Sequence, residues 1–170
     1  DINIFHLYFF IVHNHDGMMY YADYWDVVWS RPYGRYNKHH EAIWKELEAF
    51  VQGKVCDFGC GPCLLYKGKS IDLTGVDFSS KGIEEAKKNY PEGKYVVADI
   101  CDTGLPDKTF DTVLLSGVLD YYKDWERPLA EARRICKNGG KIFGTLYNGF
   151  QGHDWSKYKH ITGNWHIYEE

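Results

Sequence analysis

Residues 55–63 read Val55-Cys56-Asp57-Phe58-Gly59-Cys60-Gly61-Pro62-Cys63. An apolar run ends here in an acidic residue, and a turn with two closely spaced glycines follows. This pattern is typical of a buried parallel strand whose carboxyl end turns sharply beside a ligand. Gly59 permits the sharp turn, and Gly61 lets the backbone approach a bound molecule closely. The stretch therefore predicts an α/β fold with a binding site at the end of this strand.

Predicted strands and helices alternate on both sides of this stretch. Helical spacing of apolar residues predicts helices at 40–51, 80–90 and 128–136. Apolar runs bounded by glycine, proline or acidic residues predict strands at 54–58, 73–77, 95–98, 110–115 and 141–146. The double glycine at 139–140 is expected to break the chain before the last strand. This alternation predicts a doubly wound, mostly parallel Rossmann-like sheet.

The chain divides into four segments around that sheet. Residues 1–17 carry an apolar run that is too short to span a bilayer and lacks the basic start of a signal peptide. We expect them to be non-native upstream sequence or an arm that docks on a partner chain. Residues 18–53 form an aromatic-rich cap and a helix, in which 20–36 is either an irregular lid or an aromatic wall over a ligand. Residues 54–147 form the sheet core, and residues 148–170 form a tail without strong periodicity.

Length and composition exclude several classes of protein. The 170 residues suffice for one domain with one core. A net charge of −4 does not supply the broad basic field that non-specific nucleic-acid binding requires. Five cysteines, an odd number in strand-like and turn-like segments, do not fit a secreted disulfide framework. We therefore expect a cytoplasmic protein with neither a nucleic acid nor a membrane as its partner.

Polar residues recur where the predicted strands end. Asp57, Asp77 and Asp99 follow the first three strands, and Ser116 follows the fourth. Asp77 lies 20 positions after Asp57, which matches the spacing of about 20 at which an acid binds ribose hydroxyls. A carboxylate suits this task because its two acceptors match the two donors of a vicinal diol. Asp111 starts a strand instead, and we interpret it as structural.

The glycine turn alone does not identify the ligand. Leu64 stands where a dinucleotide fingerprint requires its third glycine, which disfavours NAD and FAD. Five motifs in order are far more specific, and they read Val55-Cys56-Asp57-Phe58-Gly59-Cys60-Gly61, Gly75-Val76-Asp77-Phe78-Ser79, Ala98-Asp99-Ile100, Phe110-Asp111-Thr112-Val113-Leu114-Leu115-Ser116-Gly117-Val118-Leu119 and Arg134-Ile135-Cys136-Lys137-Asn138-Gly139-Gly140. Over roughly residues 20–147 the chain resembles the class I S-adenosylmethionine-dependent methyltransferases of the small, Rossmann-like methyltransferase-11 type.

The resemblance implies S-adenosylmethionine as the cofactor and in-line transfer of its methyl group as the reaction. Asp57 and the turn Gly59-Cys60-Gly61 would shape the pocket for the methionine part of the cofactor. Ser116 would line the same end, near the transferred methyl group. Two positions depart from the family pattern: Cys63 replaces a usual glycine, and Asn138 replaces a usual proline.

The adenosine end of the cofactor is assigned on the same resemblance. Asp77 would hold the ribose hydroxyls, and Phe78 would lie beside the adenine. Asp99 would accept a hydrogen bond from the adenine amino group, and Ile100 would pack on the ring.

The last part of the family fold is expected to be missing from this chain. Residues 165–170 resemble the entry to the helix that precedes strands six and seven, so the chain would lack that helix and both strands through truncation. The fifth strand would then have an open edge, and open edges favour association. We therefore expect either a homodimer, formed through that edge or through the N-terminal arm, or a monomer of low stability.

Two alternatives to a methyltransferase remain open at this point. Cys56, Cys60 and Cys63 have the Cys-x3-Cys-x2-Cys spacing of radical S-adenosylmethionine enzymes, although we predict no metal site. The chain could also be a non-catalytic module that only binds S-adenosylmethionine. For a methyltransferase we expect a small-molecule acceptor, and no catalytic base is assigned. Candidates for that base are His153, Asp154, His160, His166, Tyr24, Tyr33, Tyr36 and Asp120.

Overall fold

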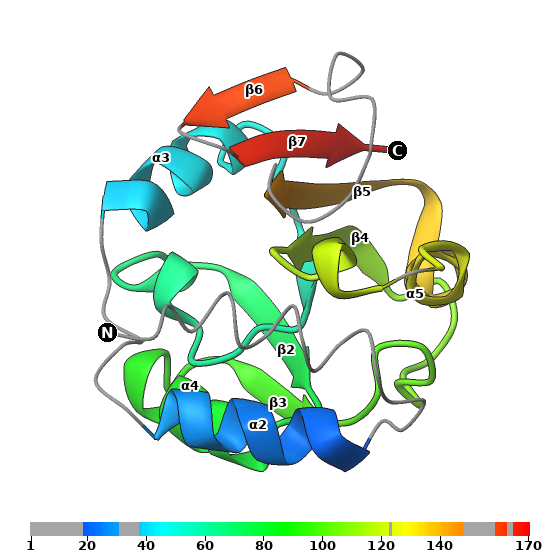
Figure 1. Cartoon of the computed structure of the whole chain (residues 1–170). Helices are drawn as coiled ribbons and strands as arrows, with labels where there is room; N and C mark the ends of the chain where they lie inside the picture. Colours follow the sequence, from blue (N-terminus) through cyan, green and yellow to red (C-terminus); the bar gives the residue numbers. More distant parts are fainter. Residues whose placement is uncertain (1–18, 31–37, 123, 148–158, 163–164) are drawn as a thin grey trace.

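The protein contains one seven-stranded sheet with the strand order β3-β2-β1-β4-β5-β7-β6. The computed structural model describes residues 19–30, 38–122, 124–147, 159–162 and 165–170. The strands are β1 (Lys54–Phe58), β2 (Asp72–Asp77), β3 (Lys94–Val97), β4 (Phe110–Ser116), β5 (Cys136–Tyr147), β6 (Lys159–Thr162) and β7 (Trp165–Glu169). The first five strands are parallel, whereas β7 is antiparallel to both β5 and β6 (Figure 1). The predicted mostly parallel, doubly wound sheet is confirmed.

Helices cover both faces of this sheet. They are α2 (Met19–Trp29), α3 (Lys38–Leu47), α4 (Ser80–Asn89) and α5 (Glu126–Ile135), with short 3₁₀ turns at η1 (Leu64–Tyr66) and η2 (Leu119–Tyr121). Buried residues of α3 and α4 pack with Val55 of β1 on one face. Buried residues of α5 pack with Cys56 of β1 on the other face. Successive residues of β1 therefore point into different cores, as the pleat of a strand requires.

The ends of the chain differ from what the sequence predicts. Strands six and seven are present, formed by β6 and β7, so their expected absence was wrong. Residues 165–169 were expected to lead into a helix, but they form the strand that pairs with β5 from Phe143↔Glu169 to Tyr147↔Trp165. The helix expected before them would fall at 148–158, outside the described residues. A short apolar run can form either a helix or a strand, and here the long-range pairing decides.

The same pairing removes the reason for the expected homodimer. β7 covers the edge of β5 that was expected to be open. The prediction of a dimer through that edge is therefore wrong. The alternative dimer contact, an arm at residues 1–17, lies outside the described residues.

Two further segments are more regular than expected. The described part of the aromatic segment is the helix α2, not an irregular lid, and residues 31–36 lie outside the described range. β5 runs from Cys136 through the double glycine at 139–140 without a break. The pairing of β5 with β4 shifts register between Phe110 and Thr112 of β4. Gly139 of β5 has a φ of 78°, in the left-handed region. The first predicted helix also ends earlier than expected, at Leu47.

Candidate functional site

The predicted site residues meet along one edge of the sheet, at the carboxyl ends of its parallel strands. The glycine turn lies against β2, because Gly59 N donates to Val76 O at 2.7 Å. The start of the loop after β3 lies beside Asp77, because Ala98 N donates to Asp77 O at 3.1 Å. On the other side, a Cβ on Gly59 would lie 2.3 Å from Val118 in the loop after β4. The edge therefore gathers Asp57, Gly59, Cys60, Gly61, Asp77, Phe78, Asp99 and Ser116.

The turn itself has a backbone that favours glycine. Gly59 and Gly61 have φ values of 68° and 47°, in the left-handed region. A side chain on Gly61 would also collide with Trp29 Cζ2, which lies 2.9 Å from the Cβ position. Cys63 ends the turn with a φ of 53° and donates its N–H to Cys60 O at 2.9 Å. Cys63, at the position where glycine is usual, thus has the left-handed conformation that glycine adopts readily. Nothing in the structure explains why this residue is a cysteine.

Asp77 holds the turn to the start of α4. Its Oδ2 accepts from Gly61 N and its Oδ1 accepts from Ser79 N, each at 2.8 Å. The residue is 4% exposed. Burial raises the pKa of its carboxyl, the two backbone bonds oppose that rise, and the charge of Asp26 adds to it. Each carboxylate oxygen keeps a second lone pair, so Asp77 can accept further bonds from a ligand.

Asp57 is a buried acid with an unused acceptor. It lies at the centre of the sheet edge and is 3% exposed. Its Oδ1 has no hydrogen-bond partner among the described residues. Burial raises its pKa to about 8, the nearby Tyr66 hydroxyl acts in the opposite direction, and the charge of Asp77 raises it further. A buried oxygen without a partner is costly, so a donor from a bound ligand would be stabilising here.

The strand end at Ser116 is fixed from β5. The Ser116 hydroxyl lies 3.0 Å from Thr145 Oγ1, which also accepts from Gly117 N at 3.0 Å. Thr145 is completely buried, so these bonds are shielded from water. Sequence reasoning missed Thr145 because a threonine inside a strand carries no signal of such a role.

The adenine end of the predicted site is less exposed than its assignment suggests. Asp99 Oδ1 accepts from Cys101 N at 2.9 Å, which forms a local turn. Ile100 is 3% exposed and belongs to the core that packs against α5. Phe78 is half-buried next to Asp77. The contacts of Asp99, Ile100 and Phe78 with a ligand stay predictions.

The cysteines do not converge as an iron–sulfur site would require. Cys56 packs in the core on the α5 face, whereas Cys60 and Cys63 pack in the core on the α3 and α4 face. All three are buried and free. Within the described part of the chain, no group of three His, Cys, Asp or Glu side chains could hold a metal ion. The iron–sulfur alternative therefore does not fit this fold.

The candidate bases were only partly placed. His160 lies on β6 and His166 on β7, where the backbones pair with each other. His153, Asp154, Tyr33 and Tyr36 fall outside the described residues. The catalytic base is thus still unassigned.

Two residues of α2 join the site without having been predicted. Asp26 accepts a hydrogen bond from the Ser79 hydroxyl, next to Asp77. Trp29 lies over Gly61, as its distance to the Cβ position there shows. The sequence offered only the general signal of an aromatic-rich segment, because the partners lie more than 30 positions away.

Among the helices that the structure describes, none has the length and the apolar character needed to cross a membrane.

Comparisons with known proteins agree with this geometry. Residues 56–144, just over half of the chain, match the family described as a methyltransferase domain. A demethylmenaquinone methyltransferase from Thermotoga maritima is 31% identical over 94 residues, covering 52% of this chain and 41% of the relative. A phosphatidylethanolamine N-methyltransferase from Cereibacter sphaeroides is 29% identical over 99 residues, covering 53% of this chain and 48% of the relative. The chain thus spans about half or less of the length of these two relatives.

A solved structure extends the similarity to the fold of most of the chain. It is a TehB-like S-adenosylmethionine-dependent methyltransferase from Corynebacterium glutamicum, with a TM-score of 0.58 and 24% identity. The similarity covers 81% of this chain and 77% of that protein. With the matching domain over just over half of its length, the chain belongs to the methyltransferase domain family, and it shares the fold of this class I methyltransferase structure.

Proposed function

We propose that this chain binds S-adenosylmethionine at the carboxyl edge of its sheet and transfers the methyl group to a small-molecule acceptor. The observation that carries the proposal is the convergence of the glycine turn with Asp57 and Asp77 at one edge, where Asp57 Oδ1 has no hydrogen-bond partner within the described part of the chain. S-adenosylmethionine supplies a methyl group on a positively charged sulfur, which an acceptor lone pair displaces in line. The matching family consists of methyltransferase domains, and we propose the same activity for this chain.

The residues at the edge fit such a ligand chemically. The free acceptor on Asp57 suits the ammonium group of the methionine part, which brings the donor that the buried oxygen lacks. The unused lone pairs of Asp77 suit a vicinal diol. The absence of side chains at Gly59 and Gly61 allows the close approach of a ligand to the backbone.

The protein would bind S-adenosylmethionine and align its methyl group with the acceptor. Asp77 would orient the ribose through two charge-assisted bonds, since its carboxylate is already fixed by Gly61 and Ser79. Ser116, held by Thr145, would define the wall near the reacting atoms. Fixed groups of this kind hold the reactants in the geometry for displacement, which is where much of the rate enhancement in such reactions arises.

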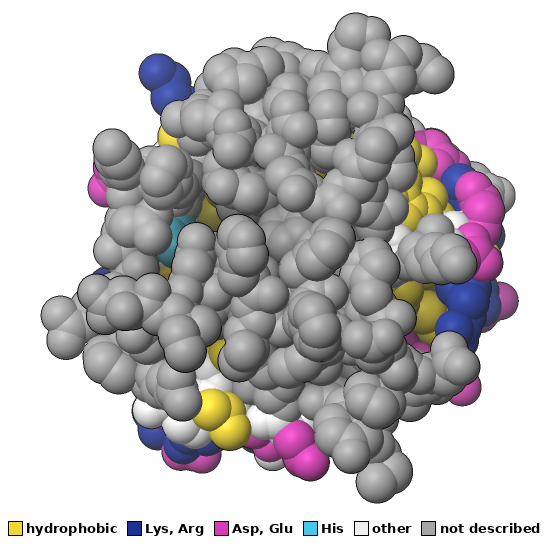
Figure 2. Space-filling model, in the orientation of Figure 1, with side chains coloured by type: hydrophobic (Ala, Val, Ile, Leu, Met, Phe, Trp, Pro, Cys, Tyr) yellow, Lys and Arg dark blue, Asp and Glu magenta, His cyan; other side chains and the backbone are white. Residues whose placement is uncertain are grey.

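A small, uncharged or weakly charged acceptor agrees with the electrostatics of the described surface. In Figure 2, charged side chains of both signs mingle along the border where α5 lies and along the border where α2 and α4 lie. Charged side chains of α4 pair with one another, as Lys88 does with Glu84 at 2.8 Å, and Arg133 of α5 pairs with Glu126 at 2.8 Å. Lys81 and Lys88 of α4, like Arg133 and Arg134 of α5, have acidic partners, which weakens the positive field that these helices could offer to a phosphate backbone.

The proposal is tested by calorimetric titration of the full chain with S-adenosylmethionine and with S-adenosylhomocysteine. We expect both to bind, and we expect Asp77→Asn to weaken binding about tenfold or more, because a charged acceptor of hydrogen bonds is lost. Asp111→Asn is the matched control, since Asp111 lies at the opposite end of the strands and bonds Lys54 N and Lys137. A wild-type chain that binds neither compound would refute the proposal.

A second experiment separates an enzyme from a binding module. The chain is incubated with cofactor labelled on the methyl group and with a panel of small acceptors carrying hydroxyl, amine, thiol or quinol groups. An enzyme produces a labelled product and S-adenosylhomocysteine in equal amounts. Binding without any product across the whole panel would favour the non-catalytic module.

A further inference from the structure

Helix α2 contacts both residues whose backbone amides hold Asp77. Those residues are Ser79 and Gly61, each donating at 2.8 Å. Asp26 of α2 accepts from the Ser79 hydroxyl, and Trp29 of α2 packs against Gly61. Residues three positions apart lie on one face of a helix, so one face of α2 reaches both supports of the Asp77 carboxylate.

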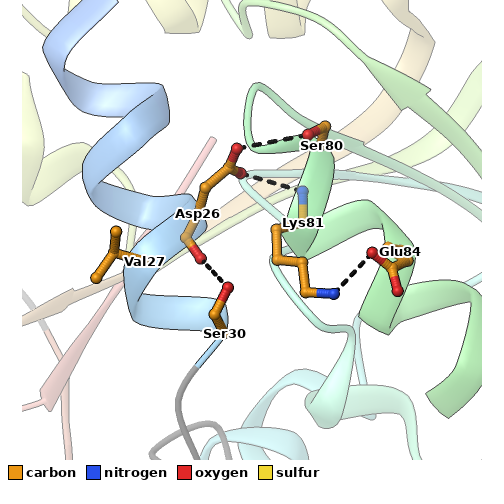
Figure 3. Close-up of a pocket in the computed structure, with 6 residues that line it drawn as sticks. All are labelled: Asp26, Val27, Ser30, Ser80, Lys81 and Glu84. Carbon is orange, nitrogen blue, oxygen red and sulfur yellow. Dashed lines mark hydrogen bonds and ion pairs between the residues drawn. The ribbon is translucent and has the colours of Figure 1, made fainter.

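Asp26 is bound firmly at the start of α4. Besides Ser79, its carboxylate accepts from Lys81 N at 3.1 Å and from Ser80 Oγ at 3.4 Å (Figure 3). The Lys81 ammonium turns instead to Glu84, at 2.7 Å. Asp26 is therefore held by backbone and hydroxyl donors at the N-terminal end of α4. This is a directed contact and not a loose surface ion pair.

A glycine lets the three elements meet. A Cβ on Gly82 of α4 would lie 3.0 Å from the Trp29 ring and 3.4 Å from Gly61 Cα. Gly82 N also donates to the Ser79 hydroxyl at 2.9 Å, which completes the cap of α4. The lack of a side chain at Gly82 thus allows α2, α4 and the glycine turn to pack in direct contact.

We propose that Asp26 is a positioning residue for the adenosyl ligand. Through Ser79 it fixes the Asp77 carboxylate, so that docking of α2 and binding of the ligand strengthen each other. The inference rests on the proposed function, because it takes Asp77 as the acceptor of the ribose hydroxyls. Coupling of this kind is reciprocal: the ligand must stabilise the docked α2 by the same factor by which docking raises the affinity.

The first test compares two acids that line the same surface pocket of about 400 Å³. Asp26→Ala removes the contact with Ser79, whereas Glu84→Gln changes an acid that bonds only lysine side chains. We expect Asp26→Ala to weaken S-adenosylhomocysteine binding about tenfold, the effect of one charged hydrogen bond, and Glu84→Gln to change it by less than about twofold. Asp26→Asn keeps an acceptor without the charge and should fall between the two.

The second test asks whether the effect travels through Ser79. In a Ser79→Ala background the hydroxyl is absent, so adding Asp26→Ala should weaken binding by less than about a further twofold. Hydrogen exchange supplies a readout that a purely structural role would not change. Ligand should protect the α2 amides in the wild type and leave them unprotected in Asp26→Ala.

A third variant guards against simple loss of folding. Gly82→Ala adds a methyl group 3.0 Å from the Trp29 ring, while alanine has the higher helix propensity and so favours α4 itself. We expect weaker ligand binding and faster exchange in α2 without a lower melting temperature of the chain.

The outcomes separate this inference from the proposed function. A wild type that binds no S-adenosylhomocysteine defeats the proposed function and this inference with it. A wild type that binds, together with an Asp26→Ala variant of equal affinity, overturns only the inference. An Asp26→Ala effect that persists undiminished in the Ser79→Ala background also overturns it, because the coupling would then bypass Asp77.

Discussion

Replacing Asp57 by asparagine should make the protein more stable at neutral pH. The carboxyl has a pKa of about 8 in the folded chain, against a value of 3.8 without the fold. Between these values the unfolded chain is ionised while the folded chain keeps a proton on Asp57. The stability associated with this group is thus fully present below pH 4 and is lost as the pH rises toward 8.

The size of the effect follows from the width of that pH window. Each pH unit inside the window lowers the free energy of unfolding by about 1.4 kcal/mol. At pH 7, about three units above the unfolded value, the accumulated loss is on the order of 4 kcal/mol. Asparagine has nearly the same shape and does not ionise, so the Asp57→Asn variant should avoid this loss. Because Asp57 is 3% exposed, solvent does not screen the effect appreciably.

The assay is urea denaturation of the wild type and the variant between pH 5 and pH 8.5. We expect the stability difference to widen steadily from pH 5 to about pH 8 and to level off above that value. Asp111→Asn is the control, because the pKa of Asp111 is lowered by its bond from Lys137 and the residue stays ionised in both states. A difference between the wild type and Asp57→Asn that is independent of pH would refute the reasoning.

Three further predictions concern the scaffold of the site. Glu131→Gln should lower the free energy of unfolding by about 1–3 kcal/mol at pH 7, because it weakens a charged hydrogen-bond network. This cost should fade as the pH drops from 4.5 toward about 2, where the pKa of Glu131 in the folded chain lies. Denaturation of both proteins at pH 7 and at pH 3 measures the difference. Thr145→Val should cost about 1 kcal/mol in melting experiments, because the Ser116 hydroxyl loses its partner Oγ1 while Gly117 N keeps only the Thr145 carbonyl. Gly53→Ala and Gly68→Ala should each lose about 1 kcal/mol to a left-handed backbone. Gly53→Ala should lose more, since its methyl group would lie 2.4 Å from Asp111 while Gly68 faces open space; equal losses would contradict this.

The centre of the sheet could be predicted because its strands carry their own signal. β1 was predicted with its observed bounds, and β2 and β4 within one residue at one end. Strands buried on both faces of a parallel sheet are nearly continuous apolar runs, and here acidic residues, serine and glycine mark their ends. The position of the site followed from those ends, since parallel strands finish at one edge of the sheet.

The outer parts of the fold could not be predicted for a different reason. β7 is recognisable only through its pairing with β5, because its five residues fit either a strand or the start of a helix. α2 is rich in aromatic residues over much of its length, so no clear apolar stripe identified it as a helix. The role of Asp26 depends on how α2 docks, and that contact joins residues 53 positions apart.

The acids of this protein fall into two groups, and the division supports a functional edge without reference to any relative. Asp111 and Glu131 have lowered pKa values because basic side chains and backbone donors pair with them. Asp57 and Asp77 have raised pKa values because they are buried, and a nearby negative charge raises each further, that of Asp77 for Asp57 and that of Asp26 for Asp77. The first arrangement stabilises a fold, whereas the second lowers its stability at neutral pH. Such costs concentrate where a protein binds something, and here both lie beside the one turn that also carries Cys63 in a left-handed conformation. A ligand that brings hydrogen-bond donors and positive charge to this edge would offset the stability that the buried Asp57 and Asp77 cost the free chain at neutral pH.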